Sequence, residues 1–502
     1  MANKKNIIYS FINGKYLESN NKTQNIYNPA TGEVTAQISM GNYDAVNIAV
    51  NAAKQAFPEW SNLSALKRSR YLFKYVELLY KNKEKLAQLI TNQHGKVFDD
   101  ALGEVQRGIE VVEFACGIPN LLKGEMSFQI SSSIDSYSMR KPVGVCTGIT
   151  PFNFPLMVPL WMFPLSIACG NTFVLKPSEK DPSATIFAVE LLHQTGIPNG
   201  VVNVVHGDKE VVDSLLTHKD IAAVSFVGST PIAKYIYETA SKHGKRVQAL
   251  GGAKNHCIVM PDADMDDATN GLMGAGYGSA GERCMAISVI VAVGNDTADK
   301  IISNLSKKID TLKIAPGDIK GAEMGPVISK EHKEKIIDYI NSGIEQGASL
   351  IKDGRNFSCK DFENGFFLGP TLFDNVKPDM TIYKEEIFGP VLSVVRVGSL
   401  KEAIALINKN QYANGTAIYT KDGASAREFS NEIQVGMVGI NVPIPVPMSF
   451  HSFGGWKNSL FGSNGMHGAE AIHFYTRLQT VTAKWSSSDF TENNQFFMPT
   501  LQ

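Results

Sequence analysis

The middle of the chain alternates between short apolar runs and segments with helical periodicity, and this alternation limits the possible folds more than any other feature. Between residues 144 and 253, runs typical of buried strands occur at 144–149, 172–175, 201–205 and 222–227. A helix is predicted from about 183 to 195, where Gly196-Ile-Pro198 ends it. Strands that alternate with helices form parallel sheets covered by helices, so the pattern predicts an α/β fold.

A second block of the same kind starts near His256 and runs to about Val446. Its strand-like runs lie at 257–260, 287–293, 392–395 and 415–419. The N-terminal region has a strand-turn-strand signal at 8–16, a turn at 28–32, and helical periodicity around 45–52 and 72–86. A chain of 502 residues is too long for one ordinary core, so two or three domains are predicted.

The composition is that of a globular protein, with 43% hydrophobic and 19% charged residues. A formal net charge of −1 gives no electrostatic reason to expect a nucleic acid or an anionic membrane as a partner. The sequence shows no signal-peptide pattern and no apolar run of the roughly 18 residues that a membrane helix needs. Its cysteines lack CxxC or pairing rhythm, and its histidines lack metal-ligand spacing. These features predict a cytoplasmic protein without a metal site.

Cys284 follows a glycine-rich segment, Tyr277-Gly-Ser-Ala-Gly-Glu-Arg, and precedes the apolar run 287–293. Gly278 and Gly281 remove side chains beside it, which favours close approach of a ligand. A thiolate is a strong nucleophile that can divide a difficult acyl-forming reaction into two easier steps. The alternative interpretation is a buried structural cysteine, since a free cysteine often behaves as a small apolar residue.

Asn153 follows the first predicted strand and stands between Phe152 and Phe154. A side-chain amide at this place can donate a hydrogen bond to an oxygen that becomes anionic during a reaction. It can also simply fix the turn before Pro155, and the residues alone leave both roles open.

Two further polar segments follow predicted strands. Lys176, Ser178 and Glu179 come after 172–175, at the carboxyl edge where open α/β sheets bind nucleotides. Lys176 and Glu179 can bond ribose hydroxyls, and a carboxylate there repels a 2′-phosphate, which favours NAD over NADP; a solvated turn with a helix cap is the alternative. Gly228 opens a helix whose amide groups can face phosphate, although Ala233 departs from the GxGxxG pattern.

Eight short segments, one of them Cys284 in its glycine setting, together resemble the aldehyde dehydrogenase superfamily along nearly the whole chain. The other segments are 147–155, 175–179, 226–230, 385–390, 414–417, 452–455 and Tyr475-Thr476. The resemblance implies an α/β fold with a Rossmann-type NAD-binding domain, an α/β catalytic domain and a β-ribbon arm for oligomerisation. The expected bounds are 1–123 and 143–253 with part of 447–467 for the NAD-binding domain, 254–446 for the catalytic domain, and 124–142 with 468–502 for oligomerisation. A homotetramer, built as a dimer of dimers, is also implied.

The resemblance also implies roles for single residues. Cys284 is the nucleophile, and Asn153 with the backbone N–H of Cys284 holds the oxyanion. Glu386 holds the nicotinamide ribose and Phe388 packs near the ring, although Glu386 could instead belong to a surface acid pair with Glu385. The NAD-binding residues implied in this way are Thr150, Phe152, Lys176, Ser178, Glu179, Lys180, Gly228, Ser229, Gly251, Glu386 and Phe388.

Within the superfamily, segments 251–256 and 439–447 resemble the CoA-acylating methylmalonate-semialdehyde dehydrogenase branch. Hydrolytic members carry a glutamate before Leu-Gly-Gly as general base, and this chain has Ala249 there. Its absence favours CoA over water as the acyl acceptor. Glu282 is a poor substitute base, because a carboxylate so close to Cys284 would raise the pKa of the thiol.

Arg107 and Arg283 match the pair that grips the substrate's carboxylate in this branch, and planar guanidinium groups bind carboxylates in bidentate fashion. For Arg107 the alternative is a surface ion pair with Glu104. The predicted reaction is the NAD-dependent, CoA-acylating oxidation and decarboxylation of methylmalonate semialdehyde to propionyl-CoA, or of malonate semialdehyde to acetyl-CoA. A hydrolytic aldehyde dehydrogenase of other specificity and a non-catalytic structural relative are the alternatives.

Overall fold

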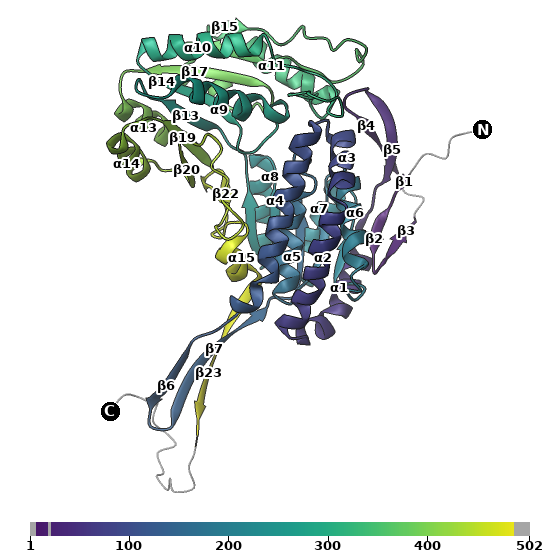
Figure 1. The fold of residues 1–502 in the computed structure, drawn as a ribbon. Coiled ribbons are helices and arrows are strands. Elements are labelled where there is room, and N and C mark those ends of the chain that lie inside the picture. The colour runs from purple at the N-terminus through teal and green to yellow at the C-terminus, as the bar shows by residue number, and fades with distance from the viewer. Residues whose placement is uncertain (1–6, 19–21, 486–502) are drawn as a thin grey trace, which may run out of the picture.

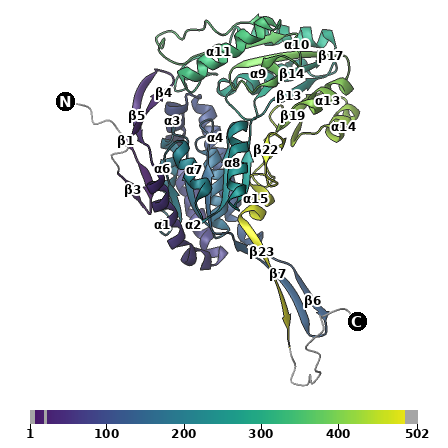
Figure 2. The same cartoon turned by 180° about the vertical axis from the view of Figure 1, so that it is seen from behind.

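The computed structural model describes residues 7–18 and 22–485, so residues 1–6, 19–21 and 486–502, which fall within the predicted NAD-binding and oligomerisation segments, lie outside the described residues. Two α/β halves and a projecting arm make up this part of the chain (Figures 1 and 2). No helix within it is long and apolar enough to cross a membrane.

The first half is built on an eight-stranded sheet in the order β22-β12-β11-β8-β9-β10-β2-β3. Its strands are β2 (Ser10–Ile12), β3 (Lys15–Leu17), β8 (Val145–Ile149), β9 (Thr172–Lys176), β10 (Val202–Val204), β11 (Ile221–Val227), β12 (Arg246–Leu250) and β22 (Leu460–Phe461). The five central strands are parallel. Four of them lie within two residues of the runs predicted from the sequence, so the predicted parallel sheet is confirmed.

Helices cover both faces of this sheet. One face packs α5 (Met157–Ala168) and α6 (Ser183–His193), with α2 (Ala65–Lys81), α3 (Lys83–His94) and α4 (Phe98–Cys116) beyond them in the same apolar core. The other face packs α1 (Tyr43–Asn62), α7 (Lys209–Thr217) and α8 (Thr230–Lys242) in a second core. The alternation of strands and helices in the sequence therefore produces the three-layered arrangement expected of an open α/β sheet.

The second half contains a seven-stranded sheet in the order β15-β16-β17-β14-β13-β19-β20. Its strands are β13 (Asn255–Val259), β14 (Ile287–Val293), β15 (Ser349–Lys352), β16 (Thr371–Asp374), β17 (Val391–Val397), β19 (Gly415–Tyr419) and β20 (Met437–Ile440). Its helices are α9 (Met265–Tyr277), α10 (Asn295–Ile309), α11 (Lys330–Glu345), α12 (Thr381–Lys384), α13 (Leu400–Lys409) and α14 (Gly423–Glu432). The sequence pattern gave no signal for β15 and β16, because β15 is a half-exposed edge strand and each has only four residues.

The arm is a three-stranded antiparallel sheet that projects from the first half (Figure 1). β7 (Ile134–Pro142) pairs with β6 (Met126–Ser131) on one side and with β23 (Thr476–Lys484) on the other. Helix α15 (Gly468–Tyr475) precedes β23 and packs its apolar side chains into the core of the first half. Segments more than 330 residues apart in the sequence therefore form one ribbon, whose pairs run from Thr476 with Pro142 to Lys484 with Ile134.

Smaller elements connect the halves. β1 (Ile7–Ile8), β4 (Thr23–Asn28) and β5 (Glu33–Ser39) form a separate sheet. The turn after β4 reaches the second half, where the backbone N–H of Phe366 donates to the carbonyl oxygen of Pro29 at 2.8 Å. The strand β18 (Tyr412–Ala413) pairs with β21 (Trp456–Lys457), and a short helix at Ile118–Asn120 packs within the first half. These contacts hold the two halves against each other around the site described next.

Candidate active site

Cys284 lies between the halves, in the loop that joins α9 to β14. The loop begins with a short 3-10 turn at Gly278–Gly281 in which Ser279, Ala280 and Gly281 all have positive φ. Non-glycine residues adopt this left-handed conformation at a cost, so the surrounding structure must hold the turn in place. It ends directly before Glu282, Arg283 and Cys284, and it sets the direction in which their side chains point.

The two glycines before Cys284 serve packing inside the protein, which corrects the interpretation that they make room for a ligand. A Cβ at Gly281 would lie 2.1 Å from the carbonyl oxygen of Gly389. A Cβ at Gly278 would lie 2.8 Å from a guanidinium nitrogen of Arg283. The glycines therefore allow the loop to approach the segment after Phe388 and allow Arg283 to fold back over it.

The main chain at Cys284 is held by Asn255 of β13 and by Asn414, which directly precedes β19. Its carbonyl oxygen accepts hydrogen bonds from the side-chain amides of Asn255 at 2.9 Å and Asn414 at 3.1 Å. The other five cysteines are buried, whereas Cys284 is partly exposed and lines a pocket. This difference disfavours the interpretation of Cys284 as a structural cysteine.

The pKa of the Cys284 thiol is raised to about 12, first by burial and then by the nearby carboxylate of Glu386. Backbone N–H groups of Cys284 and Met285 and the charge of Lys96 act in the opposite direction. The thiol is therefore the stable form in this conformation, and positive charge near it decides how readily the thiolate forms.

A pocket of about 310 Å³ opens in front of Cys284. Its lining residues come from α4, α5, the Cys284 loop and the segment after β20: Asp100, Gly103, Glu104, Arg107, Phe154, Met157, Trp161, Arg283, Cys284, Met285, Ile444, Val446 and Phe453. Both arginines predicted to bind a carboxylate are in this set, so the fold brings them to one pocket together with the thiol.

Each of the two arginines has an acidic partner within the protein. Arg107 donates to Glu110 at 3.1 Å and to the carbonyl oxygens of Val446 and Pro447 at 3.1 and 3.2 Å. The expected ion pair of Arg107 with Glu104 is wrong, because Glu104 lies on the buried face of α4 and pairs with Lys96. A partner of Arg107 on the same helix is instead Glu110, one turn later.

Arg283 donates one guanidinium nitrogen to both carboxylate oxygens of Asp100 on α4, and another to the carbonyl oxygen of Gly274 at 3.3 Å. Asp100 also lines the pocket. A carboxylate that enters the pocket therefore meets Arg283 already neutralised by a carboxylate of the protein.

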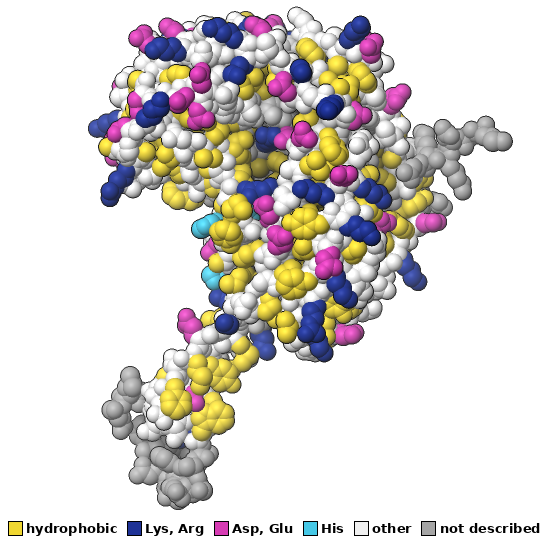
Figure 3. All heavy atoms as spheres, viewed as in Figure 1, with side chains coloured by type: hydrophobic (Ala, Val, Ile, Leu, Met, Phe, Trp, Pro, Cys, Tyr) yellow, Lys and Arg dark blue, Asp and Glu magenta, His cyan; other side chains and the backbone are white. Residues whose placement is uncertain are grey.

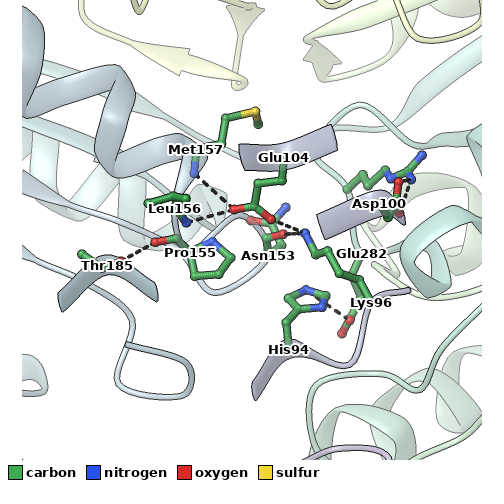
Figure 4. Close-up of polar contacts among 11 residues, drawn as sticks. His94, Lys96, Asp100, Glu104, Asn153, Pro155, Leu156, Met157, Thr185 and Glu282 are labelled. Carbon is green, nitrogen blue, oxygen red and sulfur yellow. Dashed lines mark hydrogen bonds and ion pairs between the residues drawn. The ribbon is translucent and has the colours of Figure 1, made fainter. Parts of the chain in front are cut away.

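Asn153 lies in the loop between β8 and α5, and it is buried. Its carbonyl oxygen accepts a hydrogen bond from Lys96 Nζ at 2.7 Å (Figure 4). In the described part of the chain, no hydrogen bond joins the Asn153 side-chain amide to another protein group. Its neighbour Phe154 lines the pocket of Cys284, so the loop reaches the site from the first half.

The polar residues after β9 form a compact group. Lys176 Nζ lies 2.8 Å from the carboxylate of Glu179, and the backbone N–H of Lys180 donates to the Ser178 hydroxyl at 3.1 Å. Burial tends to raise the pKa of Glu179, but the charge and hydrogen bond of Lys176 hold it below its usual value. The backbone N–H of Thr150 donates to the carbonyl oxygen of Lys176 at 3.1 Å, which joins the ends of β8 and β9.

A second polar group lies where α8 begins. Ser229 is the N-cap residue of α8, and the N–H of Gly228 donates to the carbonyl oxygen of Leu250 at 3.1 Å. The N–H of Gly251 donates to Ser459 at 3.0 Å, and a Cβ at this glycine would lie 2.6 Å from the carbonyl oxygen of Asn458.

Glu386 reaches this group from the second half. Its carboxylate accepts a hydrogen bond from the N–H of Ala253 at 2.8 Å, and burial raises its pKa to about 7. Glu385 beside it is exposed, whereas Glu386 turns inward to the N–H of Ala253. The two residues therefore do not form a surface acid pair. The ring of Phe388 packs edge-on against Phe152 with centroids 5.9 Å apart, which brings the two halves into contact.

Glu282 points away from the reacting thiol. Its carboxylate accepts from the N–H of Ile328 at 3.1 Å and lies 3.5 Å from His332 and 3.9 Å from His94. Burial raises the pKa of this carboxyl well above its usual range. Glu282 therefore belongs to a buried cluster behind the site.

Comparison with known proteins identifies the family of the chain. The sequence profile described as the aldehyde dehydrogenase family matches residues 16–481. The chain belongs to the aldehyde dehydrogenase family. It is 53% identical to a malonate-semialdehyde dehydrogenase of Pseudomonas aeruginosa, over 98% of this chain and 99% of the relative. It is 52% identical to a malonate-semialdehyde dehydrogenase of Halalkalibacterium halodurans, over 95% of this chain and 98% of the relative.

Solved structures of family members have the same fold. A methylmalonate-semialdehyde dehydrogenase from Oceanimonas doudoroffii superposes with a TM-score of 0.95 at 55% identity, covering 96% of this chain and 99% of that one. A Sinorhizobium meliloti protein, provisionally named a methylmalonate-semialdehyde dehydrogenase and solved with NAD, gives 0.96 at 53% identity, covering 97% and 99%. The predicted family and the aldehyde dehydrogenase-like fold are therefore confirmed.

The sequence did not predict Lys96 or Asp100 at the site, nor the buried role of Glu104, nor the roles of Asn255 and Asn414 at the Cys284 carbonyl. The sequence holds a signal for Glu104, because it lies at helical spacing with the buried residues Ala101, Val105 and Gly108. A charged residue on the apolar face of a helix is rarely left unpaired. Within the described residues, no group of three or more potential ligands could hold a metal ion.

Proposed function

We propose that this member of the aldehyde dehydrogenase family oxidises malonate semialdehyde and methylmalonate semialdehyde with NAD, and transfers the acyl group to CoA. The observation that carries the proposal is the pocket in which Arg107, Arg283 and Cys284 meet. Two guanidinium groups beside a thiol suit an aldehyde that also bears a carboxylate, which can replace part of their contacts with Glu110 and Asp100. The names of the relatives in Pseudomonas aeruginosa and Halalkalibacterium halodurans support the same substrate class.

The first step is attack of the Cys284 thiolate on the aldehyde carbon. The carbonyl oxygen gains negative charge, and the Asn153 amide and the backbone N–H of Cys284 donate hydrogen bonds to it. Donors that are fixed before the reaction stabilise such charge without reorganising. When this oxyanion collapses to a thioester on Cys284, the aldehyde hydrogen departs as hydride.

The residues of the first half fit a dinucleotide. Lys176 and Glu179 lie at the carboxyl end of β9, and α8 begins with Ser229 at the end of β11. Glu386 lies close to the start of α8, because a Cβ at Gly252 would meet both its carboxylate, at 2.5 Å, and the Thr230 hydroxyl, at 3.1 Å. NAD, when bound there, supplies the hydride acceptor. The carboxylate of Glu179 favours NAD over NADP, which carries an additional 2′-phosphate.

Arg107 and Arg283 orient the substrate through its carboxylate. In the resting protein both are paired, with Glu110 and Asp100, so the substrate's carboxylate has to replace part of these contacts. Once the thioester has formed, the C–C bond to the carboxylate can break and release CO2, because the thioester carbonyl accepts the electron pair. A proton then completes the acyl group, which stays bound to Cys284.

Transfer of the acyl group to the thiol of CoA ends the cycle and regenerates the Cys284 thiolate. The support for a thiol acceptor is Ala249, which is fully buried in β12 at the position where hydrolytic relatives have a glutamate base. Glu282 does not compensate, since it faces Ile328 and His332. A hydrolytic enzyme of other specificity remains the second candidate, and a CoA requirement separates the two.

A homotetramer in the cytoplasm completes the proposal. The arm exposes large apolar side chains that an isolated chain would leave in water: Met126, Phe128, Leu478 and Trp485, between 58% and 71% exposed (Figure 3). An exposed apolar patch of this kind marks a contact between protein chains. All six cysteines are free thiols, which suits a reducing compartment.

The proposed function is tested by following NADH and the acyl product from the purified protein. Malonate semialdehyde, methylmalonate semialdehyde and propanal are each supplied with NAD, in the presence and absence of CoA. Acetyl-CoA and propionyl-CoA are expected from the two semialdehydes, with turnover only when CoA is present. Free acids as the main products, formed at the same rate without CoA, would favour the hydrolytic alternative.

A further inference from the structure

A buried ion pair at α4 contacts the loop that carries Asn153. Lys96 lies between α3 and α4, and Glu104 lies on α4; their side chains are 1% and 0% exposed. Lys96 Nζ is 2.7 Å from the Glu104 carboxylate. The proposed function gives neither residue a role as nucleophile, as cofactor-binding residue or as carboxylate-binding arginine.

Both members of the pair also bind the Asn153 loop (Figure 4). Lys96 Nζ donates to the carbonyl oxygen of Asn153 at 2.7 Å and lies 4.3 Å from the centre of the Phe154 ring. The second oxygen of Glu104 accepts from the N–H groups of Leu156 and Met157, at 2.9 and 3.1 Å.

The contacts of Glu104 satisfy donors that a helix leaves unpaired. Met157 is the first residue of α5, and α5 has no side-chain cap of its own. A carboxylate at this place binds free N–H groups and also favours the positive end of the helix dipole. The segment 153–157 is thus held by hydrogen bonds at both ends, from Lys96 to its first carbonyl oxygen and from its last N–H groups to Glu104. The Thr185 hydroxyl adds a third contact, to the carbonyl oxygen of Pro155.

Stability alone does not explain this arrangement. Removing two charges from water costs about as much free energy as their attraction returns, and apolar residues often replace such pairs without loss. A buried pair that is also bonded to one loop at both ends fixes the geometry of that loop. The loop ends where the reaction occurs, because Phe154, Glu104 and Cys284 line the same pocket.

We propose that Lys96 and Glu104 are positioning residues, which hold the Asn153 amide at the oxygen that becomes anionic and place the charge of Lys96 where it favours negative charge at Cys284. This inference rests on the proposed roles of Cys284 and Asn153, but not on the semialdehyde as substrate. The other titratable groups that face Lys96 are His94 on α3, Asp181 after β9 and Glu282 before β14. The charge of Lys96 lowers the pKa of the Cys284 thiol, in agreement with the second part of the proposal.

The test uses the single-turnover formation of NADH from propanal and NAD, because this step needs no CoA and no substrate carboxylate. The variants are Lys96→Met, Glu104→Gln and the double substitution. The double substitution removes both charges, and the glutamine at position 104 keeps an oxygen that can accept hydrogen bonds from the N–H groups of Leu156 and Met157. Asn153→Ala serves as the reference for complete loss of the oxyanion donor, which typically slows such a step by about 10²- to 10³-fold. We expect each of the three variants to slow it by about 10- to 100-fold, because the donor is displaced and not removed.

Two measurements separate positioning from a general loss of structure. NAD affinity should be unchanged, and the pH profile for alkylation of Cys284 by iodoacetamide should move to higher pH in the variants without Lys96. The matched control is Lys245→Met, which removes another buried lysine that donates to two carbonyl oxygens, those of His218 and Ile221, at the opposite edge of the sheet. This control should keep both the rate and the alkylation profile of the parent.

An unchanged NADH burst in the double variant would overturn the proposal, as would a burst reduced only in proportion to lost NAD binding. Failure of all three variants to fold would also contradict it, since the pair would then be a stability element. If the parent oxidises propanal but neither semialdehyde, the proposed substrate is wrong while this test still applies. If Cys284→Ala keeps the burst, the nucleophile itself has been misassigned.

Discussion

The thiol of Cys284 illustrates how a single residue depends on charges that surround it. Burial and Glu386 raise its pKa, and Lys96 and two backbone N–H groups lower it. Any change in these neighbouring groups therefore changes the fraction of Cys284 that is ionised to the thiolate.

We expect Cys284→Ala to abolish NADH formation while the protein stays folded and binds NAD. The site tolerates the change, because a small side chain replaces another and the loop is held through the Cys284 carbonyl by Asn255 and Asn414. Initial rates with each aldehyde and a titration with NAD check this. Activity well above background would show that another residue forms the thioester.

Arg107 and Arg283 should bind the substrate's carboxylate and so favour substrates that have one. A hydrogen bond to a charged group contributes about 1.5–3 kcal/mol, so Arg107→Ala or Arg283→Ala should lower kcat/KM for the semialdehydes by roughly 10- to 150-fold. Propanal has no carboxylate, and its oxidation should be equal in variant and parent. Lysine at either position should restore activity only in part, since it lacks the planar fork. Parallel loss with both substrates would mean that the arginines stabilise the site itself.

A substitution of Asp100, the ion-pair partner of Arg283, should have the opposite effect on substrate binding. Asp100→Asn removes the carboxylate that competes for the guanidinium group, so KM for the semialdehydes should fall and KM for propanal should stay the same. Asp99→Asn, one residue away on α4, is the matched control. A higher KM for the semialdehydes would mean that Asp100 is needed to orient Arg283.

Among the elements, β12 carries Ala249, on which the proposed choice of CoA as acyl acceptor depends. Ala249 lies next to the last residue of this strand, where its neighbours in the sheet are Phe226 and Phe461. The parent should show at most a stoichiometric burst of NADH without CoA. Ala249→Glu should raise the release of free acid relative to the CoA thioester, because it introduces a general base for water. Product analysis with and without CoA checks both statements, and fast steady turnover of the parent without CoA would refute them.

At the scale of the whole molecule, the arm should control assembly. Phe128→Asp and Leu478→Asp place charges on exposed apolar positions of β6 and β23, which are 71% and 58% exposed, so the single chain should fold as before. The mass in solution, measured by light scattering, should fall from that of a tetramer toward that of a dimer. Phe73→Asp, at a 54% exposed apolar position on α2, should have no such effect. An unchanged mass in both arm variants would show that the arm is not an oligomer contact.

The sequence by itself determined the α/β class and the position of most strands, because buried parallel strands read as continuous apolar runs between helical segments. It also indicated candidate residues for the chemistry, since Cys284, Asn153, Glu386 and the two arginines match the family by resemblance. It did not reveal β15 and β16, whose short and half-exposed or isolated runs carry little pattern.

Only the tertiary structure decided the partners of these residues. Lys96 meets the Asn153 carbonyl across 57 positions of sequence, and Asp100 meets Arg283 across 183. Periodicity describes which face of a helix is buried, but it does not say which other segment covers that face. The pairing of Arg107 with Glu110, and not with Glu104, has the same cause. Helix α4 turns Glu104 into the core, where Lys96 from the preceding loop neutralises it, and leaves Glu110 partly exposed beside Arg107.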